Sequence, residues 1–442
     1  MKKKFIYISM AAFLAITTFS ACSNDVEDSM PVPAKEEEAV INDNPYAVTI
    51  DEAEKILEQF LANENEQVTK GGGVAHQRRI KSRYTTGGNK SVTRSANGED
   101  VATEEPVLHI FNFENNEGFA VMGGDKRGAP MLALTESGEF IPGATIENPG
   151  MSMSLTRAEA INRQMIIEAG SDTAYVINGQ YMIIVVTDSV TFNKHGQCQV
   201  NWGQGYPYNQ FCPPYYFGNN NYPTGCVTTA VAQLMSIHKY PASYGGCTFD
   251  WDAMIADSTH IGIGFLMQLL GNSDNLDIEY DYGGSSGTIA DAPIALHNFG
   301  YTHPGVYDDY DISTIISNIA IGLPVIIRGE GAYYKTYPDP NVPQQIREGG
   351  HAWIGDGCAI IQRTMLIYNF ATGQYMAQGP IVSQYVHCNF GWNGKGNGLF
   401  LSGHYNTDDS HYRPDDPNPF TGGFARDFNL NTDMAMVTGI SK

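Results

Sequence analysis

Positive charge is scarce in this chain. Its 442 residues include 26 Lys and Arg against 48 Asp and Glu, so the formal net charge is −22. A protein that binds nucleic acid needs a basic face to neutralise phosphates, so this balance excludes nucleic acid as a main partner. Internal repeats are absent as well. The length predicts two or three domains, and a content of 42% hydrophobic residues suffices for a sizeable core.

Long apolar runs are also lacking. The N-terminal run, Phe5–Phe19, is too short for a comfortable membrane span and follows three lysines, which predicts a signal peptide over residues 1–21. The run ends in FSAC, which resembles a bacterial lipoprotein box and implies that Cys22 is lipidated; the alternative is plain secretion after Ala21. Residues 22–45 are acidic and contain prolines, so we expect a flexible lipidated tether. The chain is then exported, as an outer-membrane or cell-surface lipoprotein.

Cysteines number only seven. When Cys22 and Cys226 are set aside for chemical roles, five remain. Because five is odd, we expect at least one cysteine without a disulfide partner in the same chain.

The residues after the tether, 46–190, are predicted to form one α+β domain. Apolar side chains on one face predict a helix over Thr49–Asn63, and a second helix is expected over Ser154–Ala169. Between them, short β-type runs broken by turns begin at Val107 and indicate antiparallel strands. The Gly-rich basic stretch at 69–100 has no periodicity and predicts an exposed loop that is open to proteolytic nicking.

The remaining residues, 191–442, are predicted to form a second α+β domain, because helical patterns come first and strand patterns follow. The predicted helices are Val227–His238, Gly262–Leu270, Ile289–Phe299 and Ile312–Ala320, and the predicted strands are Pro324–Arg328, Ala352–Gly357, Thr364–Asn369 and Tyr385–Phe390. The weakly patterned region before residue 195 marks the boundary between the two domains.

Cys226 stands at the start of the first of these helices, directly after a Pro-Thr-Gly turn. At a helix N-terminus, unpaired backbone N–H groups and the helix dipole favour a thiolate and lower the pKa of the thiol. A thiolate in this position is a nucleophile that awaits a base. The alternative is a buried cysteine that acts as a small hydrophobic residue.

The candidate base is His351, in the segment EGGHAWIGDG, where Gly350 lets another part of the chain approach the backbone closely. His351 follows Cys226 by 125 residues, close to the roughly 130–150 of papain-like enzymes. Asn389, 38 residues further on, offers a side-chain carbonyl that can orient the imidazole. Gln204, upstream of the nucleophile, offers an amide for an oxyanion hole.

Metal sites are disfavoured by the sequence. His387 and Cys388 are neighbours in a predicted strand, so their side chains point to opposite faces and do not easily bind one ion. The acidic segment Asp308–Asp311 could be a calcium loop, but acidic loops are usually only solvated. We therefore expect no metal and no cofactor.

Seven segments together resemble streptopain and its relatives, the C10 cysteine peptidases with a papain-like fold. The segments are GQGYPYN, TGCVTTAVAQLMSIHKYP, YDYGGSSGT, LHNFGY, GGHAWIGDG, HCNFGWNG and the late GGF at residues 422–424, and they span residues 195–442. Upstream, FNFENNEGFAVMGGDKR resembles the strand-turn-strand of the inhibitory pro-domain in this family.

The resemblance implies a role for each matching residue. Cys226 is the nucleophile, His351 the general base and acid, Asn389 the residue that orients His351, and Gln204 part of the oxyanion hole; Thr288 and Gly350 line the substrate cleft, and Trp392 shields the His–Asn hydrogen bond or supports its loop. The chain departs from the family at Phe390, where Trp is common. It also carries a long insertion, EGAYYKTYPDPNVPQQIRE, before the histidine.

The fold implied is a papain-like peptidase domain preceded by an inhibitory pro-domain with antiparallel strands. The activity implied is endopeptidase cleavage of extended protein or peptide substrates with an apolar residue one position before the cleaved one. The pro-domain is then an intramolecular inhibitor whose removal frees the mature enzyme, and that enzyme can be released extracellularly. Two alternatives remain: a surface lipoprotein that has kept the fold and lost activity, and an acyltransferase or amidase that uses the same Cys–His pair.

Overall fold

The structure is a computed structural model. It describes residues 46–70, 77–87, 90–94, 100–104, 107–169, 176–177, 180–181, 183–215, 220–281, 283–339, 342, 344–369, 373–406 and 432–442. The predicted signal peptide, the tether with Cys22 and the GGF segment lie outside these residues. Residues Asn44–Lys442 form one compact unit, so the two predicted domains pack together. Within the described ranges, no helix has the length and apolarity that a membrane span requires.

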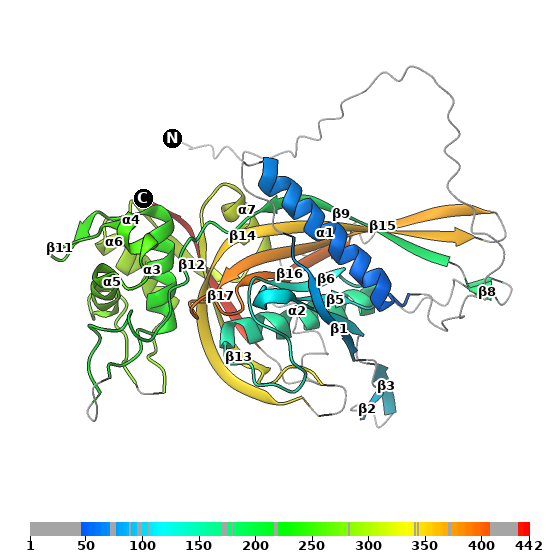
Figure 1. Cartoon of the computed structure of the whole chain (residues 1–442), viewed down its shortest axis with the longest axis horizontal. Helices are drawn as coiled ribbons and strands as arrows, with labels where there is room; N and C mark the ends of the chain where they lie inside the picture. Colours follow the sequence, from blue (N-terminus) through cyan, green and yellow to red (C-terminus); the bar gives the residue numbers. More distant parts are fainter. Residues whose placement is uncertain are drawn as a thin grey trace, which may run out of the picture. The chain divides into compact units, whose positions relative to one another are not determined.

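Antiparallel strands dominate the architecture, and the main sheet has the order β1-β4-β5-β6-β16-β15-β14-β13-β17-β12, with β9 on β14 (Figure 1). Its strands are β1 (Ile80–Thr86), β4 (Leu108–Phe113), β5 (Phe119–Gly123), β6 (Met131–Thr135), β9 (Ile183–Lys194), β12 (His303–Asp309), β13 (Val325–Tyr334), β14 (Ile346–Asn369), β15 (Gln374–Asn389), β16 (Gly398–Asn406) and β17 (Thr432–Ser441). Short two-stranded pairs are β2 (Lys90–Arg94) with β3 (Asp100–Glu104), β7 (Val176–Ile177) with β8 (Gln180–Tyr181), and β10 (Ser243–Tyr244) with β11 (Cys247–Thr248).

Two helices lie in the N-terminal segment, residues 46–190, and side chains cap the first turn of each. Helix α1 (Ile50–Lys70) begins with a capping box: the backbone N–H of Glu52 donates to the Thr49 hydroxyl, and the backbone N–H of Thr49 donates to the Glu52 carboxylate. Helix α2 (Pro149–Glu168) starts before the predicted Ser154, because the Asn148 side chain caps it and proline suits its first position.

Most of the remaining helices gather at one end of the main sheet, and the last one lies apart from them beside β14 (Figure 1). They are α3 (Cys226–His238), α4 (Trp251–Ala256), α5 (Ile261–Gly271), α6 (Ala292–Asn298), preceded by the 3₁₀ turn η3 (Ile289–Asp291), and α7 (Ile312–Ala320), which packs against β14. The predicted α+β class is confirmed, with helices before strands in the C-terminal part.

Strand β14 separates two apolar cores. Its residue Trp353 faces the larger core, which includes α2 and strands β4, β5 and β6, whereas its neighbours Ala352 and Ile354 face the core of helices α3, α5 and α6. This alternation follows from the two-residue period of a strand. One strand therefore carries side chains into both the N-terminal segment and the helical part of the C-terminal segment.

Two expectations from local pattern are wrong. The basic stretch predicted as a loop contains β1, which pairs with β4 from Ile80↔Phe113 to Thr86↔Leu108. Strand β1 is held by this long-range ladder and by ion pairs of Arg83 with Asp51 and Glu54. It does not depend on a periodic pattern of apolar residues, so no local pattern in the sequence predicts it. The two strands predicted near 352–357 and 364–369 are one strand, because β9 and β15 flank the whole of its second half.

The predicted domain boundary at 190/191 falls inside β9, which runs across it and pairs with β14 up to Cys358↔Lys194. The boundary remains a prediction. The six cysteines of the described ranges are free thiols, namely Cys198, Cys212, Cys226, Cys247, Cys358 and Cys388, so the expectation of at least one unpaired cysteine is confirmed.

A buried ion pair ties these elements together. The Arg363 side chain in β14 is 1% exposed, and its Nε and Nη2 each donate to the Asp188 carboxylate in β9 at 2.8 Å. Nη1 donates to the backbone carbonyl of Gly128, 3.1 Å away, in the N-terminal segment. The guanidinium thus links β14 to two other parts of the chain.

We expect Arg363→Met to lower the free energy of unfolding by about 3–5 kcal/mol, because it leaves the Asp188 carboxylate buried without a partner. Adding Asp188→Leu should recover most of this loss. Lys395→Met, which removes an exposed pair with Glu147, is the control and should cost less than about 1 kcal/mol. Thermal melts compare the four proteins, and equal midpoints for Arg363→Met and the control would contradict the argument.

Candidate active site

Cys226 begins helix α3, directly after Gly225, whose φ of 86° is a conformation that favours glycine. The thiol is partly exposed but lies among backbone and apolar groups, and this burial raises its pKa. The backbone N–H groups of Ala352, Val227 and Cys226 itself act in the opposite direction. The predicted lowering of the pKa is therefore wrong for this state of the protein, since desolvation outweighs the helix terminus.

Gln204 and the loop of Thr288 are brought beside the turn that precedes Cys226. The backbone carbonyl of Gln204 accepts from the N–H of Thr224 at 2.9 Å. In the loop before Thr288, the Ser285 hydroxyl donates to the Pro223 carbonyl at 2.6 Å. Thr288 itself caps η3, because its hydroxyl accepts from the Ala290 N–H. The structure thus brings two of the predicted segments to the turn that precedes the candidate nucleophile.

His351 lies in β14 opposite Gly329 of β13, and it is 3% exposed. Its Nε2–H donates to the backbone carbonyl of Phe390 at 2.8 Å. Burial lowers the pKa of the imidazole to about 4, although this hydrogen bond acts in the opposite direction. The ring is therefore neutral at physiological pH.

Aromatic rings and the start of helix α2 enclose His351. The Trp392 ring lies edge-on to the imidazole at 5.8 Å, and the Trp353 ring is stacked at 6.2 Å. On the remaining side is Gly150, in the first turn of α2, where a Cβ atom would lie 2.6 Å from His351 Cδ2 and 2.5 Å from Phe390 Cδ1. Only glycine allows the helix to approach this closely.

Asn389 shares no hydrogen bond with His351 in the part of the chain that the structure describes. Its side-chain amide donates to the Val200 carbonyl at 2.9 Å, and its side-chain oxygen accepts from the Gly391 N–H at 3.3 Å. Cys226 and His351 share no hydrogen bond in the described structure either. The contacts expected within a Cys–His–Asn set are thus absent among these three residues, and their catalytic roles remain predictions.

The insertion before His351 lengthens the β13–β14 hairpin, which forms hydrogen bonds with the N-terminal segment. Backbone hydrogen bonds of 2.9 Å join Ile146 N–H to the Lys335 carbonyl and Tyr337 N–H to the Ala144 carbonyl. The Tyr334 N–H donates to the Thr156 hydroxyl on α2 at 3.1 Å. Gly350 is exposed on this hairpin, with Glu330 opposite.

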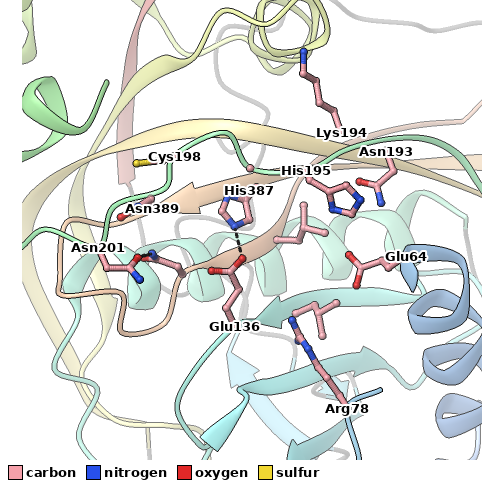
Figure 2. Close-up of a pocket in the computed structure, with 15 residues that line it drawn as sticks. Glu64, Arg78, Glu136, Asn193, Lys194, His195, Cys198, Asn201, His387 and Asn389 are labelled. Carbon is pink, nitrogen blue, oxygen red and sulfur yellow. Dashed lines mark hydrogen bonds and ion pairs between the residues drawn. The ribbon is translucent and has the colours of Figure 1, made fainter. Parts of the chain in front are cut away.

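Figure 2 shows a polar cavity of about 160 Å³ between the N-terminal and C-terminal segments. His387 in β15 projects toward it, with Nε2 at 3.1 Å from Glu136 and Nδ1 at 2.7 Å from Asp356. In the sequence, His387 stands out only as a disfavoured metal ligand, and neither carboxylate partner is predicted. No local signal marks this contact, because Glu136 and His387 are 251 residues apart.

Comparisons with known proteins support the sequence resemblance. Residues 202–400 match the model of the peptidase C10 family, and residues 45–161 match the Spi protease inhibitor model. Streptopain of Streptococcus pyogenes is 24% identical over 341 residues, which cover 66% of this chain and 73% of that protein. The thiol protease/hemagglutinin PrtT of Porphyromonas gingivalis is 24% identical over 161 residues, which cover 36% of this chain and 18% of that protein.

Among solved structures, prointerpain A of Prevotella intermedia matches with a TM-score of 0.49 at 19% identity, covering 82% of this chain and 99% of that one. Active interpain A of the same organism matches with a TM-score of 0.37 at 21% identity, covering 57% of this chain and 97% of that one.

Gly150→Val should push the first turn of α2 away from His351 and raise the pKa of the imidazole from about 4 by about one unit or more. NMR pH titration of histidine-labelled protein measures this pKa, and Ile167→Ala, half-exposed near the other end of α2, is the control.

In the unmodified chain, the His351 ring packed under α2 binds no proton between its ordinary pKa of 6.5 and about 4, whereas a ring exposed to solvent does. Packing should therefore weaken by about 3 kcal/mol as the pH falls through this range. If the pKa of His351 stays near 4 in Gly150→Val, the packing of α2 against the ring is not what lowers it.

Proposed function

The chain belongs to the C10 family of cysteine peptidases, and residues 45–161 form its own inhibitor segment. We therefore propose that it is a secreted or surface-anchored endopeptidase that is activated by removal of that segment. Cys226 and His351 are the reacting groups. Proteins and peptides in extended conformation are the substrates.

The observation that carries this proposal is the contact of α2 with His351. The first turn of α2 packs on the imidazole, the Nε2–H is engaged by the Phe390 carbonyl, and no hydrogen bond joins His351 to Cys226. A thiol without its base, in a desolvated position, is a poor nucleophile. Inhibition therefore acts on the assembly of the catalytic pair, and it relies on the same histidine that catalysis requires.

Release of α2 frees the His351 ring to face Cys226 and draw the thiol proton. The thiolate attacks the substrate carbonyl, and the Gln204 amide and the Cys226 backbone N–H donate to the oxyanion. The imidazolium then protonates the leaving amine, and the C–N bond breaks to leave a thioester. Water, deprotonated by His351, attacks the thioester and regenerates the Cys226 thiol. Asn389 would orient His351 after exchanging its present partner, the Val200 carbonyl.

The test compares residues 23–442 with their Cys226→Ala variant under reducing conditions, using gels and a casein assay. We expect only the unmodified chain to shorten itself and then to cleave casein, with at least ~1,000-fold less cleavage by the variant, because the nucleophile is lost. Cys247→Ala, another free cysteine, is the control and should behave like the unmodified chain. If all three proteins stay full length and inert even after trypsin nicking, the chain is instead an inactive surface binding protein.

Surface anchoring rests on the FSAC sequence alone. We expect Cys22→Ala to abolish incorporation of a labelled fatty acid and to shift the protein from the membrane to the soluble fraction, because one thiol is the attachment point. Metabolic labelling and fractionation of cells that express the two proteins measure this. Unchanged labelling in Cys22→Ala would contradict lipidation at this cysteine.

A further inference from the structure

His387 bridges the peptidase domain and the inhibitor segment. Its Nδ1–H donates to Asp356 in β14. Its Nε2–H donates to Glu136, which follows β6 in the inhibitor segment (Figure 2). The His387 side chain is 12% exposed and Asp356 is fully buried, whereas Glu136 is 53% exposed at the edge of the contact. Protons can therefore reach the pair from solvent on the Glu136 side.

Asp356 and His387 form a dyad that is complete within the peptidase domain. The second oxygen of the Asp356 carboxylate accepts from the Cys198 N–H at 2.6 Å, so the carboxylate is held in place from both sides. A Cβ atom at Gly196 would lie 2.6 Å from His387 Nδ1, so the chain passes close over the ring. The dyad leaves Nε2 as one outward-facing donor, which suits a carboxylate.

Glu136 is placed on this donor by the backbone. Its N–H donates to the Asn397 carbonyl at 2.7 Å, and the neighbouring residue Thr135 pairs with Gly398. This short β6–β16 ladder is where the strands of the inhibitor segment join those of the peptidase domain. A contact that stabilises this ladder stabilises the place where the two parts of the main sheet meet.

We propose that Asp356 and His387 form a carboxylate-binding site on the peptidase, that Glu136 occupies it in the zymogen, and that this contact is a pH-sensitive latch on the inhibitor segment. The regulatory meaning of the latch rests on the proposed function. The carboxylate-binding site itself does not.

Two ionisations define the working range of the latch. Burial acts to lower the pKa of His387, but the charges and hydrogen bonds of Asp356 and Glu136 outweigh it and raise the pKa well above 6.5. Burial acts to raise the pKa of Glu136, but its hydrogen bond and charge interaction with His387 and the charge of Arg78 outweigh it and lower the pKa below 4.5.

The ion pair therefore contributes its full stabilisation between pH 4.5 and pH 6.5, the ordinary pKa values of the two groups. This stabilisation is lost in acid as the pH falls through the lowered pKa of Glu136. It is lost in alkali as the pH rises through the raised pKa of His387.

Other ionisable and charged groups face the same cavity from the elements around it. They are Glu64, Arg78, Lys194, His195 and Cys198. Glu64 also becomes neutral toward acid, since burial raises its pKa. These groups, together with His351, are present in every variant of the experiment, so a comparison between variants at each pH isolates Glu136.

The experiment uses the full chain with Cys226→Ala, so that self-cleavage cannot contribute. Hydrogen–deuterium exchange over β6 and β16 is measured between pH 3 and pH 10 and expressed as protection relative to the intrinsic exchange rate. Glu136→Gln is compared with Glu114→Gln, an exposed carboxylate of the same segment, and His387→Gln tests the dyad from the other side.

At pH 7 we expect Glu136→Gln to lower the protection of β6 about fivefold, because a charged hydrogen bond at a partly exposed position is lost. His387→Gln should lower it at least as much, and Glu114→Gln should not change it. The effect of Glu136→Gln should vanish in strong acid, where the carboxylate of the parent chain is itself protonated, and should shrink in alkali. An effect that is the same at every pH, or that is matched by Glu114→Gln, would overturn the proposal.

The two proposals fail separately. Loss of the exchange effect with casein cleavage intact would remove the latch and leave the peptidase. A pH-dependent exchange effect in a chain that never cleaves casein would keep the carboxylate-binding site and remove the peptidase.

Discussion

The close approach of Gly150 to His351 and Phe390 is the contact on which this structure depends. A side chain at this position would collide with both rings, so the inhibitor segment reaches the candidate base through bare backbone. The remaining contacts between the two segments hold this turn in place. The Asn148 cap donates to the Lys395 carbonyl at 2.7 Å, the extended β13–β14 hairpin pairs with residues 143–146, and β6 pairs with β16.

Strand β14 connects these contacts to the rest of the molecule. Over its 24 residues it carries His351 under α2, Asp356 in the dyad with His387, and Arg363 in the buried pair with Asp188. Each of these side chains also receives or gives a contact that involves the inhibitor segment, directly or through one intermediate. Departure of the segment would therefore change the surroundings of the base, the dyad and the buried arginine together.

His351 and His387 show how partners, rather than burial alone, decide ionisation. His351 finds only aromatic rings and one backbone carbonyl, so desolvation dominates and the ring is neutral. His387 is also desolvated, but it has a carboxylate at each ring nitrogen, and their charges stabilise the imidazolium. The neutral His351 ring can accept a proton, whereas the charged His387 ring can join two segments through its carboxylate partners. The same type of side chain is thus neutral in one setting and charged in the other.

The sequence by itself determined the α+β class, most of the helices, and the order of the family segments around Cys226 and His351, because periodicity and motif spacing are local properties. It also pointed to an inhibitor segment through one strand-turn-strand pattern. Only the tertiary structure decided that strand β1 forms, that β14 is one strand, and that His387 meets Glu136, since each depends on partners far away in the chain. It also decided that the Cys226 thiol has a raised rather than a lowered pKa, because desolvation is set by what packs around a residue and not by its neighbours in sequence.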